Sequence, residues 1–454
     1  MRFFAYICLA LVIIGCHSCN KQPVKTKLNI VFILADDLGW PQLGCYGSDY
    51  YETPNLDRLA SEGMRFTNAY AACAVCSPTR ASIMTGKYPA RLHLTDFIAG
   101  NNRTDYMLTQ PDWQKLLPLE EVTIAEILHD QGYHTALYGK WHLSPEKKPP
   151  ESLPYNPDKQ GFDKCIVTYK PDQFSDPEND AHNVDSITDA AIDFLNRHQN
   201  DPFFLFVSHN SIHDPLMERK SLIEKYEQKK DAGKPENNPV IGAMIETLDK
   251  SIGRILNKLT ELELDKNTII VFFSDNGSKE SYAKQTPLRS GKGWLYEGGV
   301  RVPLIIRLPG LIEAGSVSDD IVASNDLLPT LTNLLTIKNI QKNTDGIPFD
   351  NVLLGNGRGK RDKMYWHYPH YHVGSGMVPG AAMRKEHYKL IEWYEKSLTG
   401  QDGAFELYDL ENDISEEHDL SDEMPDKLEE LKTLLDQWKS QVNVQMPTIH
   451  KDLN

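Results

Sequence analysis

The chain has 454 residues, a formal net charge of −16, and hydrophobic and charged fractions of 40% and 25%. These values exclude a disordered, collagen-like or polytopic membrane protein, and the length predicts two to three domains or one large domain with an appendage. The net negative charge argues against nucleic acid as a partner, because proteins bind a phosphate backbone through a basic surface. It does not exclude a small anion as a ligand, because such a ligand responds to the local charge of its site.

Residues 1–19 are predicted to be an export signal. A positive start is followed by an apolar run at residues 3–14, which is shorter than the roughly 20 residues of a membrane-spanning helix. Ile13-Ile14-Gly15-Cys16 resembles a bacterial lipobox, whose cysteine is acylated after cleavage; the alternative is an ordinary secretory signal that is cut slightly later. Residues 20–27 form a polar tether. We expect export to the periplasm or cell envelope, with a lipid on Cys16 as the sole membrane anchor.

Residues 28–360 alternate between strand and helix patterns. Four nearly continuous apolar runs are typical of strands buried on both faces, at residues 28–34, 203–207, 268–273 and 304–308. Helical patterns lie between them, at residues 54–62, 123–131, 187–197 and 243–259. This alternation predicts an α/β fold with a large, mostly parallel, doubly wound sheet.

Residues 361–454 are predicted to form a smaller α+β subdomain with an antiparallel sheet and a terminal helix. An aromatic segment at residues 364–372 is followed by strand patterns at 388–394 and 406–410. Apolar residues recur at helical spacing within residues 425–442, and we interpret this stripe as core packing on the last sheet.

Polar residues follow three of the four predicted strands. Asp36 and Asp37 follow the first strand, His209 the second, and Asp275 and Asn276 the third. Ligands of such sheets gather beyond the carboxyl ends of the strands. Adjacent buried carboxylates require a cation or basic partners, and oxygen-rich clusters select hard ions such as calcium or magnesium. Either pair alone also fits a turn or a helix cap, but the two pairs together predict a cation site.

The segment Cys76-Ser77-Pro78-Thr79-Arg80 carries the most specific motif. Cys73 and Cys76 also have the spacing of a thiol redox pair or of half a zinc ribbon, but no second such pair exists among the cysteines beyond the predicted leader. Cys-x-Pro-x-Arg followed by Thr85-Gly86-Lys87 resembles the signature of type I sulfatases in the alkaline-phosphatase-like superfamily. The alternative is an ordinary cysteine at a helix start. In the family a maturase oxidises this cysteine to formylglycine, whose hydrate supplies a gem-diol nucleophile.

The resemblance covers about residues 28 to 450 and assigns residues 28–360 to the sulfatase catalytic domain. The other matching segments follow in the family's order: Leu38-Gly39, Thr53-Pro54-Asn55-Leu56-Asp57, Gly139-Lys140-Trp141-His142-Leu143, His213-Asp214-Pro215, Ser274-Asp275-Asn276-Gly277, Lys292-Gly293 and Arg301-Val302-Pro303. His209 is atypical at its position.

The resemblance also implies roles for individual residues. It gives calcium ligation to Asp36, Asp37, residue 76, Asp275 and Asn276. Arg80 and Lys140 would hold residue 76 and its sulfate. His213, with Lys292 nearby, would protonate the leaving oxygen of the sugar. His142 would then take a proton from residue 76 to expel sulfate.

The tail, from Trp366 to Ile391, looks like exported carbohydrate sulfatases of gut and marine bacteria. This likeness implies exo action on a sulfated galactose or N-acetylgalactosamine unit of host or algal glycans. The predicted sugar contacts are Asn102, Arg103, His367, His370 and Arg384, although an aromatic strand that packs under the main sheet explains the tail equally well. Two alternatives stay open, namely a phosphoester or phosphonate hydrolase of the same superfamily and an inactive sugar-binding lipoprotein.

Overall fold

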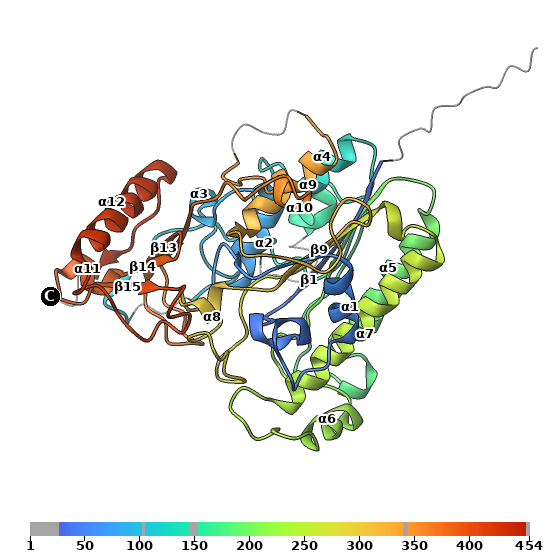
Figure 1. Ribbon diagram of the computed structural model, residues 1–454, viewed down its shortest axis with the longest axis horizontal. Helices are drawn as coiled ribbons and strands as arrows, with labels where there is room; N and C mark the ends of the chain where they lie inside the picture. Colours follow the sequence, from blue (N-terminus) through green and yellow to red (C-terminus); the bar gives the residue numbers. More distant parts are fainter. Residues whose placement is uncertain (1–26, 102–104, 146–152, 339–343, 451–454) are drawn as a thin grey trace, which may run out of the picture.

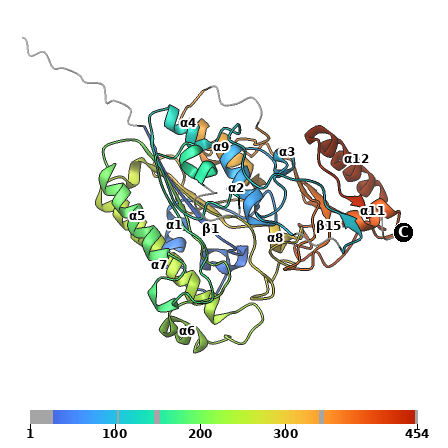
Figure 2. The ribbon, with the colours of Figure 1, turned by 180° about the vertical axis from the view of Figure 1, so that it is seen from behind.

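The computed structural model describes residues 27–101, 105–145, 153–338 and 344–450. The predicted leader with Cys16, most of the tether, and Asn102 and Arg103 lie outside these residues. An α/β body with a central sheet makes up most of the molecule (Figure 1). The antiparallel sheet and α12 lie at one end of the molecule, and α5 lies at the other, in both views (Figures 1 and 2).

The main sheet has eight strands within the described residues, in the order β10-β2-β9-β8-β1-β7-β5-β6. Their bounds are β1 Asn29–Ala35, β2 Met64–Phe66, β5 His134–Gly139, β6 Lys164–Val167, β7 Phe203–Ser208, β8 Thr268–Ser274, β9 Leu304–Arg307 and β10 Ser316–Ser318. Strands β8, β1, β7, β5 and β6 are parallel to one another. The predicted large, mostly parallel sheet is therefore confirmed.

Strand β9 differs from its neighbours in direction. The sequence pattern at residues 304–308 predicts a buried strand, and β9 is one, but it runs antiparallel to both β8 and β2. Its residues are buried on both faces, as in the parallel strands. Burial alone therefore does not distinguish the two directions in a sheet covered on both sides.

Helices cover both faces of the sheet, which explains the continuous apolar strands. In β1, Phe32 packs in one core cluster with α2, α4 and α9, whereas Ile33 packs in the other with α1, α5 and α7. The helices of the body are α1 Pro54–Glu62, α2 Cys76–Thr85, α3 Pro89–Leu92, α4 Ile124–Asp130, α5 Val184–Arg197, α6 Lys220–Glu227, α7 Pro239–Glu261, α8 Glu297–Val300, α9 Leu327–Leu334 and α10 Asp350–Leu353. Among the helices described, none combines the length and apolarity needed to span a bilayer.

The C-terminal region forms a separate four-stranded antiparallel sheet. Its strands are β12 Lys363–Tyr368, β13 Gly380–Lys385, β14 Tyr388–Trp393 and β15 Phe405–Asp409, followed by α12 Pro425–Val442, with α11 Tyr394–Thr399 after β14. Leu431, Leu435 and Trp438 of α12 are buried in one cluster with residues of β13 and β14, as the stripe predicts. Two small pairs complete the fold: β3 Ala69–Tyr70 with β11 Val322–Ala323, and β4 Leu108–Thr109 with β16 Thr448–Ile449.

Candidate active site

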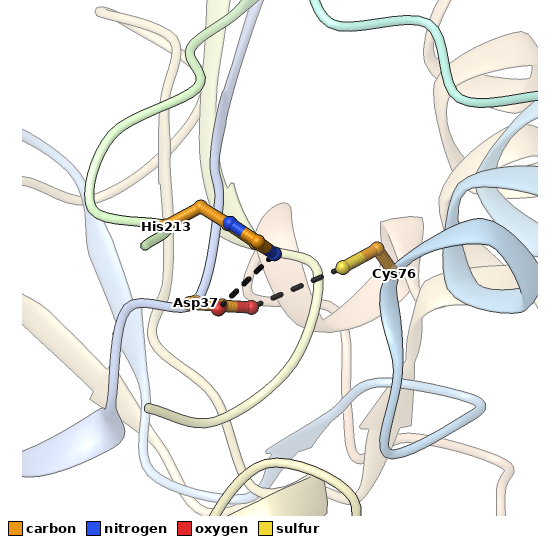
Figure 3. A group of neighbouring side chains, drawn as sticks. All are labelled: Asp37, Cys76 and His213. Carbon is orange, nitrogen blue, oxygen red and sulfur yellow. Dashed lines mark hydrogen bonds and ion pairs between the residues drawn. The ribbon is translucent and has the colours of Figure 1, made fainter. Parts of the chain in front are cut away.

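The carboxyl ends of β1 and β8 bring the predicted acidic residues together with Cys76. Ala35 pairs with Ser274, so Asp36 and Asp275 leave neighbouring strands at the same level. The Cys76 thiol lies 3.5 Å from Asp36 Oδ1 and 3.9 Å from Asp37 Oδ1. The side chains of Asp36, Asp37, Cys76 and Asp275 are all buried, and one ligand atom from each lies within 4.8 Å of the others. In Figure 3 the Asp37 carboxylate lies between the Cys76 thiol and the imidazole of His213.

The start of α2 explains the local sequence around Cys76. Cys76 is the first residue of the helix, and Pro78 stands in the first turn, where the missing backbone N–H is not needed by the helix. The Thr79 hydroxyl donates to the Cys73 carbonyl oxygen at 3.0 Å and accepts from the Cys73 N–H at 3.2 Å, which fixes the turn before the helix. Arg80 extends from the same turn towards the carboxylates. Each position of the motif therefore has a structural function.

Three basic residues face three buried carboxylates. The closest contacts are Lys140 Nζ to Asp36 Oδ2 at 2.7 Å, Lys292 Nζ to Asp37 Oδ2 at 2.8 Å, and Arg80 Nη2 to Asp275 Oδ2 at 2.7 Å. The formal charges of these six groups cancel. A divalent cation among the carboxylates would leave the site positive, which suits an anionic ester even though the whole protein is acidic.

The cations set the protonation of the carboxylates. Burial alone opposes ionisation of Asp36, but Lys140, His213, Arg80 and Lys292 outweigh it and hold the pKa of Asp36 well below its usual range. Burial similarly opposes ionisation of Asp37, and mainly Lys292 lowers its pKa. Asp275 differs, because burial and the charge of Asp36 raise its pKa to about 6.

The same burial keeps the Cys76 thiol protonated. Burial raises the pKa of this thiol far above its ordinary value, and the nearby lysines do not compensate. A thiolate is the nucleophilic form of cysteine, so the unmodified side chain is a poor nucleophile here.

Asn276 indicates that these residues fit a hard divalent cation. Its Nδ2 donates to Asp37 Oδ1 at 2.7 Å, whereas its buried Oδ1 has no hydrogen-bond partner in the described part of the chain. Buried polar atoms without partners are uncommon in folded proteins. An ion bound by Asp36, Asp37 and Asp275 would satisfy this oxygen, and an oxygen-rich set of this kind suits calcium or magnesium.

Two histidines flank the cluster with different proton arrangements. His213 Nδ1 lies 2.8 Å from Asp214 Oδ1 and 2.7 Å from the Asp214 carbonyl oxygen. Both oxygens are acceptors, so Nδ1 carries a proton. The other ring nitrogen, Nε2, lies 3.8 Å from Asp37 Oδ2. His142 Nε2 donates to the Ile98 carbonyl oxygen at 2.6 Å. Its buried Nδ1 has no partner among the described residues and is therefore the free basic nitrogen. Burial, together with Lys140, lowers the pKa of His142 well below its usual value.

The backbone orients these side chains at an energetic cost. Asp37 and His142 have φ angles of 63° and 59°, in the left-handed region that costs roughly 1–3 kcal/mol for a residue with a side chain. Gly139 precedes the Lys140 segment with a φ of 115°, and a Cβ atom there would lie 1.7 Å from the Ser208 carbonyl oxygen. Glycine therefore lets the end of β5 approach β7 closely, and Lys140 N–H donates to that same oxygen at 2.8 Å.

Three predicted sugar contacts are instead committed to internal hydrogen bonds. His367 accepts from the Tyr394 hydroxyl and donates to the Gln445 carbonyl oxygen. His370 lies between the Thr95 hydroxyl and Gln110 Oε1, and Arg384 binds the Tyr70 hydroxyl and the Glu386 carbonyl oxygen. All three side chains are buried. The partners of His367 lie within the C-terminal region, whereas His370 and Arg384 bond to residues of the body, and these bonds satisfy polar groups that are buried. His209, buried beside Ser251, likewise has a structural role.

Two residues near the site are missing from the sequence-based predictions. Asp214 holds His213 Nδ1, and its position directly after the motif histidine is a signal that the sequence contains. His372 lies beside the Lys292-Gly293 segment, since a Cβ on Gly293 would meet its Nδ1 at 2.2 Å. Burial and Lys292 lower the pKa of His372 to about 4, so the ring is neutral at pH 7. Nothing in the sequence links His372 to a lysine 80 positions earlier.

Comparison with known proteins assigns this site to a family. The pattern of the family described as Sulfatase matches residues 28–337. The chain belongs to the sulfatase family. A second pattern, described as N-sulphoglucosamine sulphohydrolase, C-terminal, matches residues 290–443 of this sulfatase. The protein is a type I sulfatase with the alkaline-phosphatase-like fold, and hence a sulfuric ester hydrolase.

Individual relatives cover nearly the whole sulfatase. A sulfatase of Formosa agariphila is 30% identical, with 94% of this chain and 90% of the relative aligned. An N-acetylgalactosamine-6-O-sulfatase of Bacteroides thetaiotaomicron is 28% identical over 93% of this chain and 96% of the relative. The crystal structure of Ps i-CgsB in complex with k-i-k-neocarrahexaose superposes with a TM-score of 0.76, at 27% identity, over 94% and 95% of the two chains. Sulfatases generally use a formylglycine and a divalent metal ion, and the buried acidic cluster around Cys76 is suited to both.

Proposed function

We propose that this sulfatase removes sulfate from carbohydrates through a formylglycine at position 76 that acts beside a bound calcium ion. The observation that carries the proposal is the Cys76 thiol within 3.5 Å of Asp36, in a buried group whose three carboxylates are already balanced by three basic side chains. A thiol kept protonated in this way has little use as a nucleophile itself. Its oxidation by a formylglycine-generating maturase gives the residue a function.

The protein's own side chains account for the remaining steps. When Cys76 is matured and calcium is bound, the site gains a gem-diol nucleophile and a charge that withdraws electrons from the sulfate oxygens. Lys140 and Arg80 hold residue 76 and the sulfate oxygens in place. His213 donates a proton from Nε2 to the leaving sugar oxygen, and Lys292 stabilises negative charge there. His142 accepts a proton from residue 76 at Nδ1, its free nitrogen.

The proposed substrate is a terminal sulfated galactose or N-acetylgalactosamine unit of a host or algal glycan. Support comes from the relative named N-acetylgalactosamine-6-O-sulfatase and from the similar structure that is in complex with k-i-k-neocarrahexaose. His367, His370 and Arg384 are buried and hydrogen-bonded within the protein, which favours other residues as the sugar contacts. A panel of defined saccharides that differ in sugar, in sulfate position, and in terminal or internal placement tests this assignment. Release from internal units only would contradict exo action.

The export and anchoring of the protein belong to the same proposal. The apolar segment before Cys16 supports transport to the periplasm or cell envelope and a lipid on Cys16. Replacing Cys16 by serine would then move the protein from the membrane fraction to the soluble fraction. An unchanged distribution would contradict the lipid anchor.

Two cysteine variants test the chemistry of the site. Cys76→Ala is expected to abolish sulfate release and to leave the melting temperature nearly unchanged. Cys73→Ala is the matched control, because this buried cysteine lies three residues earlier and outside the acidic cluster, so activity should persist. Sulfate release by Cys76→Ala would refute the mechanism. Turnover of aryl phosphate above aryl sulfate by the mature enzyme would instead favour the phosphoester hydrolase alternative, and glycan affinity without any turnover would favour the sugar-binding lipoprotein.

A further inference from the structure

A second group of metal-ligating side chains lies at the opposite end of β5 from the active site. His134 is the first residue of β5, whereas Lys140 directly follows its last residue. At about 3.3 Å per residue, the two ends are roughly 20 Å apart. His198 caps the C-terminus of α5, and Asp201 stands in the short connection from α5 to β7. We call His134, His198 and Asp201 the β5 triad.

Backbone hydrogen bonds fix the relative positions of the β5 triad. The His198 N–H donates to the Phe194 carbonyl oxygen at 3.0 Å, and the Asp201 N–H donates to the His198 carbonyl oxygen at 3.2 Å. The His134 N–H donates to the Pro202 carbonyl oxygen at 2.9 Å. The three side chains therefore project from a connected backbone frame, and their proximity does not depend on chance contacts of long flexible side chains.

The spacing of the β5 triad is close to that of a zinc site. One ligand atom from each residue lies within 4.8 Å of the others, and His134 Nε2 is 3.8 Å from Asp201 Oδ2. Tetrahedral zinc with ligands at about 2.0–2.1 Å requires ligand atoms about 3.3 Å apart. The observed distance of 3.8 Å between His134 and Asp201 exceeds the required one of about 3.3 Å. Both side chains are about half exposed, so each has room for the small rotation that would bring their ligand atoms closer.

The surroundings hold the His198 ring in place and leave one of its nitrogens without a partner among the described residues. The His198 ring packs against Phe194 at 4.5 Å and against His134 at 4.4 Å between ring centroids. Its buried Nδ1 has no hydrogen-bond partner in the described part of the chain. Two imidazoles and one carboxylate suit zinc and similar divalent transition metals, whereas the all-oxygen partners of calcium are absent from this triad.

We propose that His134, His198 and Asp201 bind a divalent transition-metal ion, with zinc as the representative ion, independently of the catalytic site. Three protein ligands leave a fourth position open to water, as in catalytic zinc sites. The ion would join the end of α5 to the start of β5 and of β7. Bound zinc should therefore raise the melting temperature, because it binds the folded state alone.

Calorimetric titration of zinc into the full mature protein tests this site, with no polyhistidine tag and with calcium present at saturation. We expect one zinc equivalent to bind, and His134→Gln or Asp201→Asn to weaken the affinity at least about tenfold. The matched control is His129→Gln, an exposed histidine on α4 that pairs with Asp163 and lies outside the triad, and it should bind zinc like the wild type.

A spectroscopic readout separates zinc at the triad from zinc at the catalytic cluster. Cobalt added to the calcium-saturated protein should give a ligand-field absorption band that His134→Gln removes and His129→Gln retains. No zinc binding by the wild type, or an affinity unchanged in both triad variants, would overturn the proposal. Sulfate release by His134→Gln should match the wild type, so failure here is distinct from failure of the proposed function.

Discussion

Replacing Asp214 by asparagine tests whether His213 delivers the proton to the leaving group. The carboxylate accepts from His213 Nδ1 at 2.8 Å, and the pKa of Asp214 is held well below its usual value, first by that hydrogen bond and then by nearby charges. Asparagine keeps an acceptor oxygen in the same place and removes only the charge. The variant therefore isolates the electrostatic support of the imidazolium form.

The magnitude follows from the nature of the contact. A hydrogen bond to a charged partner contributes about 1.5–3 kcal/mol and a neutral one about 0.5–1.5 kcal/mol, so removing the charge from this partly exposed pair, 13% and 31% exposed, costs about 1 kcal/mol. A loss of about 1 kcal/mol lowers kcat/KM roughly fivefold. The loss should appear with sulfated sugars, because an alkoxide is a poor leaving group. It should be much smaller with an aryl sulfate, whose phenolate needs little protonation.

The assay compares kcat/KM for one sulfated monosaccharide and one aryl sulfate in each variant. Tyr282→Phe is the matched control, because its hydroxyl donates to Asp214 Oδ2 at 3.2 Å and its removal leaves the carboxylate in place. With both substrates, Tyr282→Phe should lower kcat/KM by less than Asp214→Asn lowers it with the sulfated sugar. Equal losses on the two substrates, or no loss on either, would refute the role of His213 as the general acid.

Two further predictions concern stability and the metal. Burial raises the pKa of Asp96 to about 7, so the folded state binds the proton of this carboxyl group more tightly than the unfolded state does. The resulting contribution to the free energy of unfolding is present in full below about pH 4 and is lost as the pH rises towards 7. About three pKa units correspond to at most about 4 kcal/mol of unfolding free energy. Thermal melts should therefore show Asp96→Asn gaining stability relative to the wild type as the pH rises from 4 to 7. A difference in melting temperature between the two proteins that stays constant over this range would contradict the prediction. Chelation of divalent ions should abolish sulfate release by the matured enzyme and lower its melting temperature, and added calcium should restore both. Full activity of a protein shown to be metal-free by elemental analysis would refute the cation site.

The sequence is sufficient to predict the acidic cluster because simple geometry connects its parts. Continuous apolar strands are covered by helices on both faces, and β1 and β8 are parallel neighbours, so the polar residues at their carboxyl ends meet at one edge. Asp36, Asp37 and Asp275 follow this rule. Cys76 is added by the family motif rather than by periodicity.

Other features depend on tertiary contacts that no local pattern contains. Strand β9 has the same buried pattern in either direction, and β2 and β10 are only three residues long. The histidine- and aromatic-rich tail suits a sugar site and internal packing equally well, and only the structure shows that His367 and His370 are buried and hydrogen-bonded within the protein. His372 reaches Lys292 only through the fold.

The most direct test of the account relates sulfate release to the chemical state of residue 76. Preparations with different degrees of maturation can be made by varying coexpression of the maturase, and peptide mass spectrometry gives the fraction of formylglycine in each. The account predicts that kcat per mole of protein rises in proportion to this fraction and extrapolates to zero for the unmodified cysteine. Substantial sulfate release from protein in which residue 76 is entirely cysteine would contradict it.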